Sequence, residues 1–154
     1  MKAGILCAAV VGVFDQATKY VILEHVMNPP HRIEVTPFFN IVLAWNRGVS
    51  FGLFGHESDL GPILLTLLTV VISIALLIWM RRADDRLTVV ALGLIIGGAL
   101  GNVIDRVRFG AVTDFLDFHA FGYHWPAFNI ADSAICIGAA ILIGSSLFRR
   151  DEKA

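Results

Sequence analysis

Four long apolar segments constrain this chain more than any other feature of its sequence. Each is about 20 residues long, which is the length that an α-helix needs to cross the hydrocarbon core of a bilayer. They cover residues 3–23, 61–80, 87–104 and 128–148. Only 16% of the 154 residues are charged, against about 25% in soluble domains. The sequence therefore predicts one integral membrane domain over residues 1–154, mainly α-helical with four transmembrane helices.

The first apolar segment has a second interpretation, as a cleaved signal peptide. We disfavour it because the polar run Asp15-Gln16-Ala17-Thr18-Lys19 follows the apolar stretch and no small-x-small cleavage site is convincing. The positions of the basic residues then predict the orientation, since cytoplasmic loops are rich in Lys and Arg. With four spans, one side carries Lys2, Arg81, Arg82, Arg86, Arg149, Arg150 and Lys153. We expect both termini on that side, in the cytoplasm, and segments 25–60 and 105–127 outside it.

Segment 25–60 has its own pattern. Apolar residues recur there with a period of two, which is typical of a half-buried strand: Ile33, Val35, Phe39, Ile41, Leu43 and Trp45. Asn46-Arg47-Gly48 then supplies residues that favour a turn. We predict a small extracytoplasmic β-element on the membrane surface, with Phe38, Phe39, Trp45, Phe51 and Phe54 in the interfacial belt.

Two aspartates lie where a membrane protein rarely tolerates them. Asp114 follows the third apolar segment and Asp132 opens the fourth, with Gly122 and Pro126 between them. A carboxylate near hydrocarbon costs roughly 2.5–3.5 kcal/mol on insertion scales, so it usually has a function. Two that converge share one proton and activate water, as in aspartic proteases. From these residues alone, helix capping or arginine pairing and ion or proton passage remain alternatives.

Other polar residues in or beside the spans offer support for such a site. Asp15 and Lys19 form an i,i+4 pair, which indicates a structural ion pair within the first span. Asn102 and Arg106 share one helix face, and we expect that face to hold Asp114; a local Asp105–Arg106 pair is the alternative. Two weaker ideas are a serine nucleophile at Ser50 and a metal at His119, His124 and Asp117, whose spacing matches no strong motif.

Together these motifs resemble those of the bacterial lipoprotein signal peptidase (signal peptidase II) family, over almost the whole chain. The matching motifs are Asp15-x-x-x-Lys19, Asn46-x-Gly48-x-x-Phe51, Gly97-Gly98-x-x-Gly101-Asn102-x-x-Asp105-Arg106, Val112-x-Asp114-Phe115 and Phe128-Asn129-x-Ala131-Asp132. Each is weakly specific alone, whereas five in this order on four predicted spans are highly specific.

The resemblance implies an aspartic endopeptidase of the bacterial inner membrane. Such enzymes remove the signal peptide of prolipoproteins by cutting before a diacylglyceryl-modified cysteine, toward the periplasmic face. It implies Asp114 and Asp132 as the catalytic pair and Asp15 with Lys19 as a structural polar pair. It places substrate-binding or supporting roles on Asn46, Gly48, Gly98, Asn102, Arg106 and Asn129.

The resemblance also implies a β-cradle and a short periplasmic helix within segment 25–60. The expected partners are prolipoprotein substrates, membrane lipid and cyclic depsipeptide inhibitors. No metal or organic cofactor is expected, and the net charge of −1 gives no reason to expect nucleic acid. A small proton- or ion-coupled carrier and a non-enzymatic assembly subunit are the competing functions.

Overall fold

Four long helices and a small sheet make up the computed structural model, which describes residues 1–48 and 60–151. The helices are α1 (Lys2–Val21), α2 (Leu60–Arg82), α3 (Arg86–Phe109) and α4 (Ile130–Asp151), and a π-helical turn, η1 (Ile22–Val26), follows α1. All four are long and apolar enough to cross a membrane. The predicted four-helix membrane fold is thus confirmed.

Helix α3 is the centre of the bundle. It contacts α1, α2 and α4. In its most apolar 18-residue stretch, 61% is buried within the protein, against 11–17% of the corresponding stretches of the other three helices. The other helices therefore direct most of their apolar side chains outward, toward lipid. α3 begins at the N-cap Asp85, whose carboxylate accepts the Thr88 amide at 2.8 Å. It ends at Gly110 with a left-handed φ of 70°.

The third span was predicted to end at about residue 104. The helix itself continues to Phe109, so that Asp105 and Arg106 lie on the last turns of α3. The apolar pattern stops before the helix does because the last turns of α3 carry polar side chains that the protein itself buries, as with Asp105.

Glycines allow α3 to approach two neighbours on adjacent faces. A methyl group on Gly97 would lie 2.6 Å from the carbonyl oxygen of Ala8 on α1. One on Gly98 would collide with the carbonyl oxygen of Ala131 on α4. Small residues on α3 thus allow its backbone to pack closely against α1 and α4.

The sheet contains strands β1 (Ile33–Thr36), β2 (Phe39–Asn46), β3 (Val112–Ala120) and β4 (Tyr123–His124). They pair antiparallel in the order β1-β2-β3-β4. The predicted β-element in segment 25–60 is confirmed as the β1–β2 hairpin. Strands β3 and β4 were not predicted, although Phe121 and Gly122, with φ of 50° and 82°, form the kind of two-residue turn that favours a hairpin.

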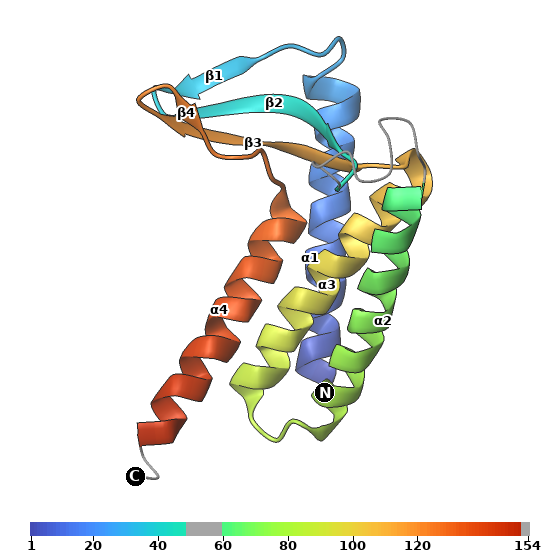
Figure 1. Ribbon diagram of the computed structural model, residues 1–154, viewed down its shortest axis with the longest axis vertical. Helices are drawn as coiled ribbons and strands as arrows, with labels where there is room; N and C mark the ends of the chain where they lie inside the picture. The colour runs from blue at the N-terminus through green and yellow to red at the C-terminus, as the bar shows by residue number, and fades with distance from the viewer. Residues whose placement is uncertain (49–59, 152–154) are drawn as a thin grey trace.

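The sheet and the α2–α3 connection lie at opposite ends of the helix bundle (Figure 1). Both termini and the α2–α3 connection lie at one end of the bundle, and the sheet lies across the other end. The short helix implied for segment 25–60 is not found in residues 27–48. Residues 49–59, which include Ser50, Phe51 and Phe54, lie outside the described part of the chain.

We predict that Gly97→Ala destabilises the protein by about 1–3 kcal/mol, because the added methyl group meets backbone atoms of α1 that cannot move aside. The matched control is Gly144→Ala on α4, where a methyl group meets nothing within 4 Å. The control should leave stability unchanged or slightly raised. Thermal unfolding of both variants in detergent measures the difference, and equal melting temperatures would contradict the close α1–α3 packing.

Candidate active site

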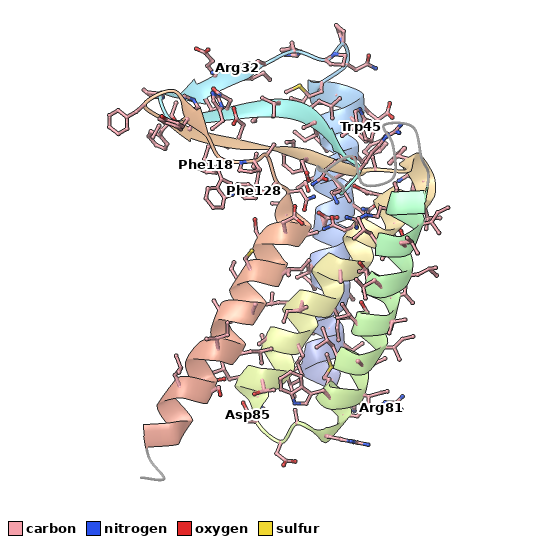
Figure 2. The ribbon with its side chains drawn as sticks, viewed as in Figure 1. Arg32, Trp45, Arg81, Asp85, Phe118 and Phe128 are labelled. Atoms are coloured by element: carbon pink, nitrogen blue, oxygen red, sulfur yellow. The ribbon has the colours of Figure 1, made fainter. Side chains whose placement is uncertain are left out.

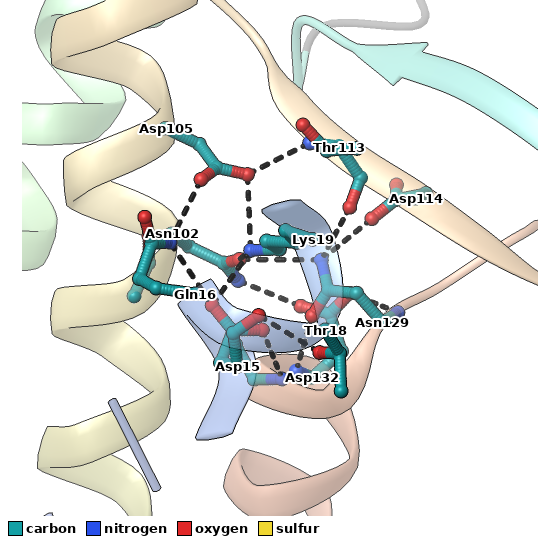
Figure 3. Close-up of polar contacts among 12 residues, drawn as sticks. Asp15, Gln16, Thr18, Lys19, Asn102, Asp105, Thr113, Asp114, Asn129 and Asp132 are labelled. Atoms are coloured by element: carbon teal, nitrogen blue, oxygen red, sulfur yellow. Dashed lines mark hydrogen bonds and ion pairs between the residues drawn. The ribbon is translucent and has the colours of Figure 1, made fainter. Parts of the chain in front are cut away.

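A buried polar cluster lies where the sheet meets the ends of α1, α3 and α4 (Figure 3). It contains ten labelled residues from four different elements and their connections. Its least exposed members, each with 2% exposure or less, are Asp15, Lys19, Asp105, Thr113, Asp114 and Asn129. A cluster of this polarity inside a membrane protein is stable only if its groups satisfy one another.

Lys19 is the positive centre of this cluster. Its ammonium lies 2.9 Å from Asp15 Oδ2 and 3.0 Å from Asp105 Oδ2, and it donates to Asn102 Oδ1 at 3.1 Å. An ammonium has three hydrogens, so each has an acceptor. The predicted Asp15–Lys19 pair is present, and Asp105 is a second carboxylate that joins it. The alternative local pair between Asp105 and Arg106 does not form.

Neutral hydrogen-bond donors bind the remaining acceptor sites of the Asp15 and Asp105 carboxylates. Gln16 Nε2 donates to Asp105 at 2.9 Å and to Asp15 at 3.2 Å. The Thr113 amide of β3 donates to Asp105 at 2.9 Å, and the Ala131 amide in the first turn of α4 donates to Asp15 at 2.9 Å. A helix N-terminus favours a negative charge. Through these bonds the Lys19 centre joins α1, α3, β3 and α4.

Asn129 stands at the start of α4 and connects Asp132 to Asp114. Its Oδ1 accepts the Asp132 amide at 2.9 Å, and Asp132 Oδ2 accepts the Asn129 amide at 3.3 Å. This reciprocal pair is a capping box, so the expected capping geometry of Asp132 is present. Because Asn129 Oδ1 caps the helix, the NH2 group of the same side chain points in the other direction, and its Nδ2 donates to Asp114 Oδ1 at 2.7 Å.

Two other asparagines are oriented in the same way. Asn46 Oδ1 accepts the amide of Gly48, which has a φ of +79°, at 2.8 Å; its Nδ2 donates to Asp114 Oδ2 at 2.9 Å. Asn102 Oδ1 accepts from Lys19, and its Nδ2 donates to Asp132 Oδ1 at 2.8 Å. In each case a fixed donor holds the amide oxygen, so the NH2 group must point at an aspartate.

The expectation that Asn102 and Arg106 hold Asp114 is wrong for Asn102, which donates to Asp132. Asp114 is held by Asn46 and Asn129. The i,i+4 spacing gave the correct face of α3, but the element packed against that face is the start of α4.

Asp114 lies on β3, opposite Ala44 of β2, with Asn46 as a diagonal neighbour opposite Val112. Its side chain is only 1% exposed. Burial raises the pKa of Asp114 to about 6; the Asn46 and Asn129 amides oppose this rise, and the nearby charge of Asp132 adds to it. Asp132 is partly exposed. The site therefore holds one deeply buried carboxyl group beside a more accessible one.

Arg106 supplies a second positive charge, close enough to Asp132, Asp114 and Asp105 to interact with them electrostatically. Its Nη1 donates to the Asn102 carbonyl oxygen at 3.4 Å. Its Nε is buried and, within the described part of the chain, has no hydrogen-bond partner. Gly48 lies nearby, since a methyl group there would be 3.6 Å from Arg106 Nη2. Gly98 contributes packing against α4 beside Asp132 and no polar contact.

The histidines considered for a metal lie near the far end of the sheet. His124 Nδ1 is 2.8 Å from Asp117 Oδ1, and the rings of His119 and His124 stack with centroids 4.8 Å apart. Asn40 Nδ2 donates to the other oxygen of Asp117 at 2.7 Å. Among the described residues, no three ligating side chains converge.

Sequence reasoning left Asp105, Thr113 and Gln16 out of the site. The pairing of Asp105 could have been inferred from the sequence. A carboxylate on a membrane helix requires a cation, and Lys19 is the one lysine in the four predicted spans. The role of Thr113 rests on its backbone amide, which no side-chain pattern reveals.

Comparison with known proteins identifies relatives over nearly the whole chain. A family model described as signal peptidase (SPase) II matches residues 7–148. The lipoprotein signal peptidase of Methylobacterium radiotolerans is 48% identical over 149 residues, which cover 95% of this chain and 86% of that protein. That of Rhodopseudomonas palustris is 44% identical over 152 residues, covering 96% of this chain and 93% of that protein.

Solved structures agree with these relatives. A bacterial membrane enzyme determined by the in meso method at 2.3 Å resolution superposes with a TM-score of 0.83 at 37% identity, covering 100% of this chain and 93% of that one. A second, at 1.9 Å resolution, gives a TM-score of 0.82 at 38% identity, covering 96% and 94%. Sequence and fold thus agree, and the chain belongs to the signal peptidase II family.

Proposed function

We propose that this protein is an aspartic endopeptidase that removes signal peptides from diacylglyceryl-modified prolipoproteins, cutting before the lipidated cysteine. The observation that carries the proposal is the link through Asn129, which contacts both Asp114 and Asp132. Membership of the signal peptidase II family supports the same reaction. The catalytic pair is Asp114 and Asp132, and no metal or organic cofactor takes part.

The two carboxyl groups take different roles because their surroundings differ. Asp114 is deeply buried with a raised pKa, so it holds the shared proton and hydrogen-bonds the scissile carbonyl oxygen. Asp132 is the more accessible of the two, so we assign it as the base that takes a proton from the attacking water. The water oxygen adds to the carbonyl carbon while Asp114 gives its proton to the carbonyl oxygen. The tetrahedral intermediate then collapses: the C–N bond breaks, Asp132 gives its proton to the leaving amine, and Asp114 recovers its proton from the hydroxyl group as the carbonyl forms again.

Arg106 and the asparagines support this chemistry without reacting. Asn46, Asn102 and Asn129 hold the two carboxyl groups in place through their NH2 groups. The positive charge of Arg106 interacts electrostatically with both carboxyl groups. Gly48 lies close to that guanidinium. Asp15 and Lys19 act structurally, beneath the catalytic pair.

The site faces the periplasm in this proposal. Lys2, Arg81, Arg82 and Arg86 lie at the end of the bundle with both termini, opposite the sheet, and the positive-inside rule places that end in the cytoplasm. The sheet and the catalytic pair then lie at the outer leaflet of the bacterial inner membrane. A lipid-anchored cysteine holds the scissile bond at that depth. Cyclic depsipeptide inhibitors are expected to occupy the catalytic pair.

We predict that Asp114→Asn and Asp132→Asn each lower the rate of cleavage by at least about 100-fold, since each removes one half of the acid–base pair. The assay is cleavage of a diacylglyceryl-modified prolipoprotein peptide by purified protein in detergent. The matched control is Asp117→Asn, on the same strand as Asp114 but bonded to Asn40 and His124. Near-normal turnover by either catalytic variant would overturn the mechanism. Proton or ion flux in proteoliposomes without cleavage would favour a carrier.

We predict that kcat/KM falls with a one-proton dependence as pH rises through about 6, where Asp114 loses its proton. The sign follows from its role, because the proposed acid is active below its pKa and inactive above it. Asn46→Ala removes a hydrogen bond that lowers this pKa, so the midpoint of the fall should move to higher pH. A kcat/KM that rises with pH over the same range would give Asp114 the role of base.

A further inference from the structure

The sheet carries a cluster of exposed aromatic rings at the end away from the catalytic pair. Phe39 of β2 pairs with Phe118 of β3, so the β1–β2 turn and the β3–β4 turn lie at the same end of the sheet. The Phe38 carbonyl accepts the His119 amide at 2.9 Å, which joins the two turns directly. We call this end, residues 37–39 and 118–125, the aromatic tip.

Large aromatic side chains on the aromatic tip are exposed and lack cover from the described part of the chain. The exposed fractions are 56% for Phe38, 83% for Tyr123 and 70% for Trp125, and Phe121 is fully exposed. Rings of the tip also line a hollow of about 400 Å³. Such a concentration of exposed aromatic surface on a soluble face would be unusual, and it marks an interaction site.

Charge is missing from the same segment. Residues 118–128 contain five aromatic residues and two histidines but no Asp, Glu, Lys or Arg. Two carboxylates lie in the row of the sheet behind them. Asp117 is buried and bonded to Asn40 and His124, and Glu34 of β1, opposite Asn40, is exposed but lies 3.6 Å from Arg32. The aromatic tip can therefore enter an apolar or interfacial environment without the cost of desolvating an unpaired charged side chain.

The position of the aromatic tip identifies what it contacts. Phe39 in the tip and Asn46 at the catalytic pair are the first and last of the eight residues of β2, so they lie about 23 Å apart at roughly 3.3 Å per residue step. The sheet runs across the end of the bundle, and this end projects sideways past the helices on the side of α4 (Figure 1). Figure 2 shows Phe118 and Phe128 on this side of the molecule and Trp45 on the other.

The helix beneath the aromatic tip, α4, is long and apolar enough to cross a membrane. The outward side chains of α4 include Ile137, Ile143 and Leu147, each more than half exposed. A bilayer that covers these residues ends at the level of the sheet, so its head-group region lies under the projecting aromatic tip. Trp and Tyr are enriched at this depth because their rings are apolar and their N–H and O–H groups remain hydrated.

We propose that the aromatic tip inserts into the head-group region of the leaflet on the sheet side and anchors the sheet to the bilayer. The rings of Phe121, Tyr123 and Trp125 make this contact. The Trp125 amide donates to the Phe118 carbonyl oxygen at 2.8 Å, and the Phe118 ring in turn packs against Phe39 and Phe128 with centroids 4.7 Å and 5.9 Å away. Because Asp114 lies on the same strand as Phe118, the anchor also sets the depth of Asp114; only this consequence rests on the proposed function.

Tryptophan fluorescence tests the anchor directly. The chain has three tryptophans, so Trp45→Phe with Trp79→Phe leaves Trp125 as the reporter. The protein is placed in nanodiscs of phospholipid brominated near the head-group end of the acyl chains, with iodide as the aqueous quencher. The control is Trp45→Phe with Trp125→Phe, which leaves Trp79 in the α2 span at 48% exposure.

We expect brominated lipid to quench Trp125 to an extent comparable with Trp79, and iodide to quench it weakly. Adding Phe121→Ser and Tyr123→Ser should weaken lipid quenching of Trp125. The matched pair Ile143→Ser and Leu147→Ser, similarly exposed on α4, should leave it unchanged. Quenching of Trp125 by iodide alone, or by neither reagent, would overturn the proposal, as would full lipid quenching in the Phe121/Tyr123 variant. None of these results depends on peptidase activity.

Discussion

The ammonium of Lys19, buried among Asp15, Asp105 and Asn102, is the interaction on which the rest of this structure depends. An unpaired ammonium in a membrane bundle would be prohibitively costly, and so would either carboxylate alone. Together they are stable because Gln16 and two backbone amides complete the carboxylate shells. The helices cannot shift without exposing one of these charges to an apolar surrounding, so the polar centre specifies how they pack.

The polar centre also determines how the asparagine side-chain amides of the site are oriented. Lys19 can only donate, so Asn102 must present its oxygen to Lys19 and its NH2 group to Asp132. The first turn of α4 and the amide of Gly48 impose the same choice on Asn129 and Asn46. Reversing any of these amides would bring two donors face to face, which costs a buried hydrogen bond. The two carboxyl groups are therefore positioned by groups that have one satisfied orientation, while α3, β3 and α4 supply the rigid supports.

The sheet connects two environments that the helices alone would keep apart. One end of β2 and β3 carries Asn46 and Asp114 beside the polar centre, and the other end carries the aromatic tip on the side of α4. Antiparallel pairing fixes the distance between them. A site that meets a substrate held in the bilayer needs a defined depth, and the sheet would provide it if the proposed anchor holds the aromatic tip at the membrane surface.

The sequence by itself determined the four spans, the β1–β2 hairpin and the Asp15–Lys19 pair, because each depends on local periodicity or on spacing within one helix. It did not reveal β3, since Val112, Thr113, Asp114 and Phe115 are all buried and the alternation of a half-exposed strand is lost. It gave the correct face of α3 for Asn102 but the wrong aspartate. Only the tertiary structure decided that α4 begins against that face, that Asp105 joins Lys19 and that Asn129 links the two carboxyl groups. These contacts join residues far apart in the chain, and their partners are chosen by helix packing and by the requirement that every buried charge be satisfied.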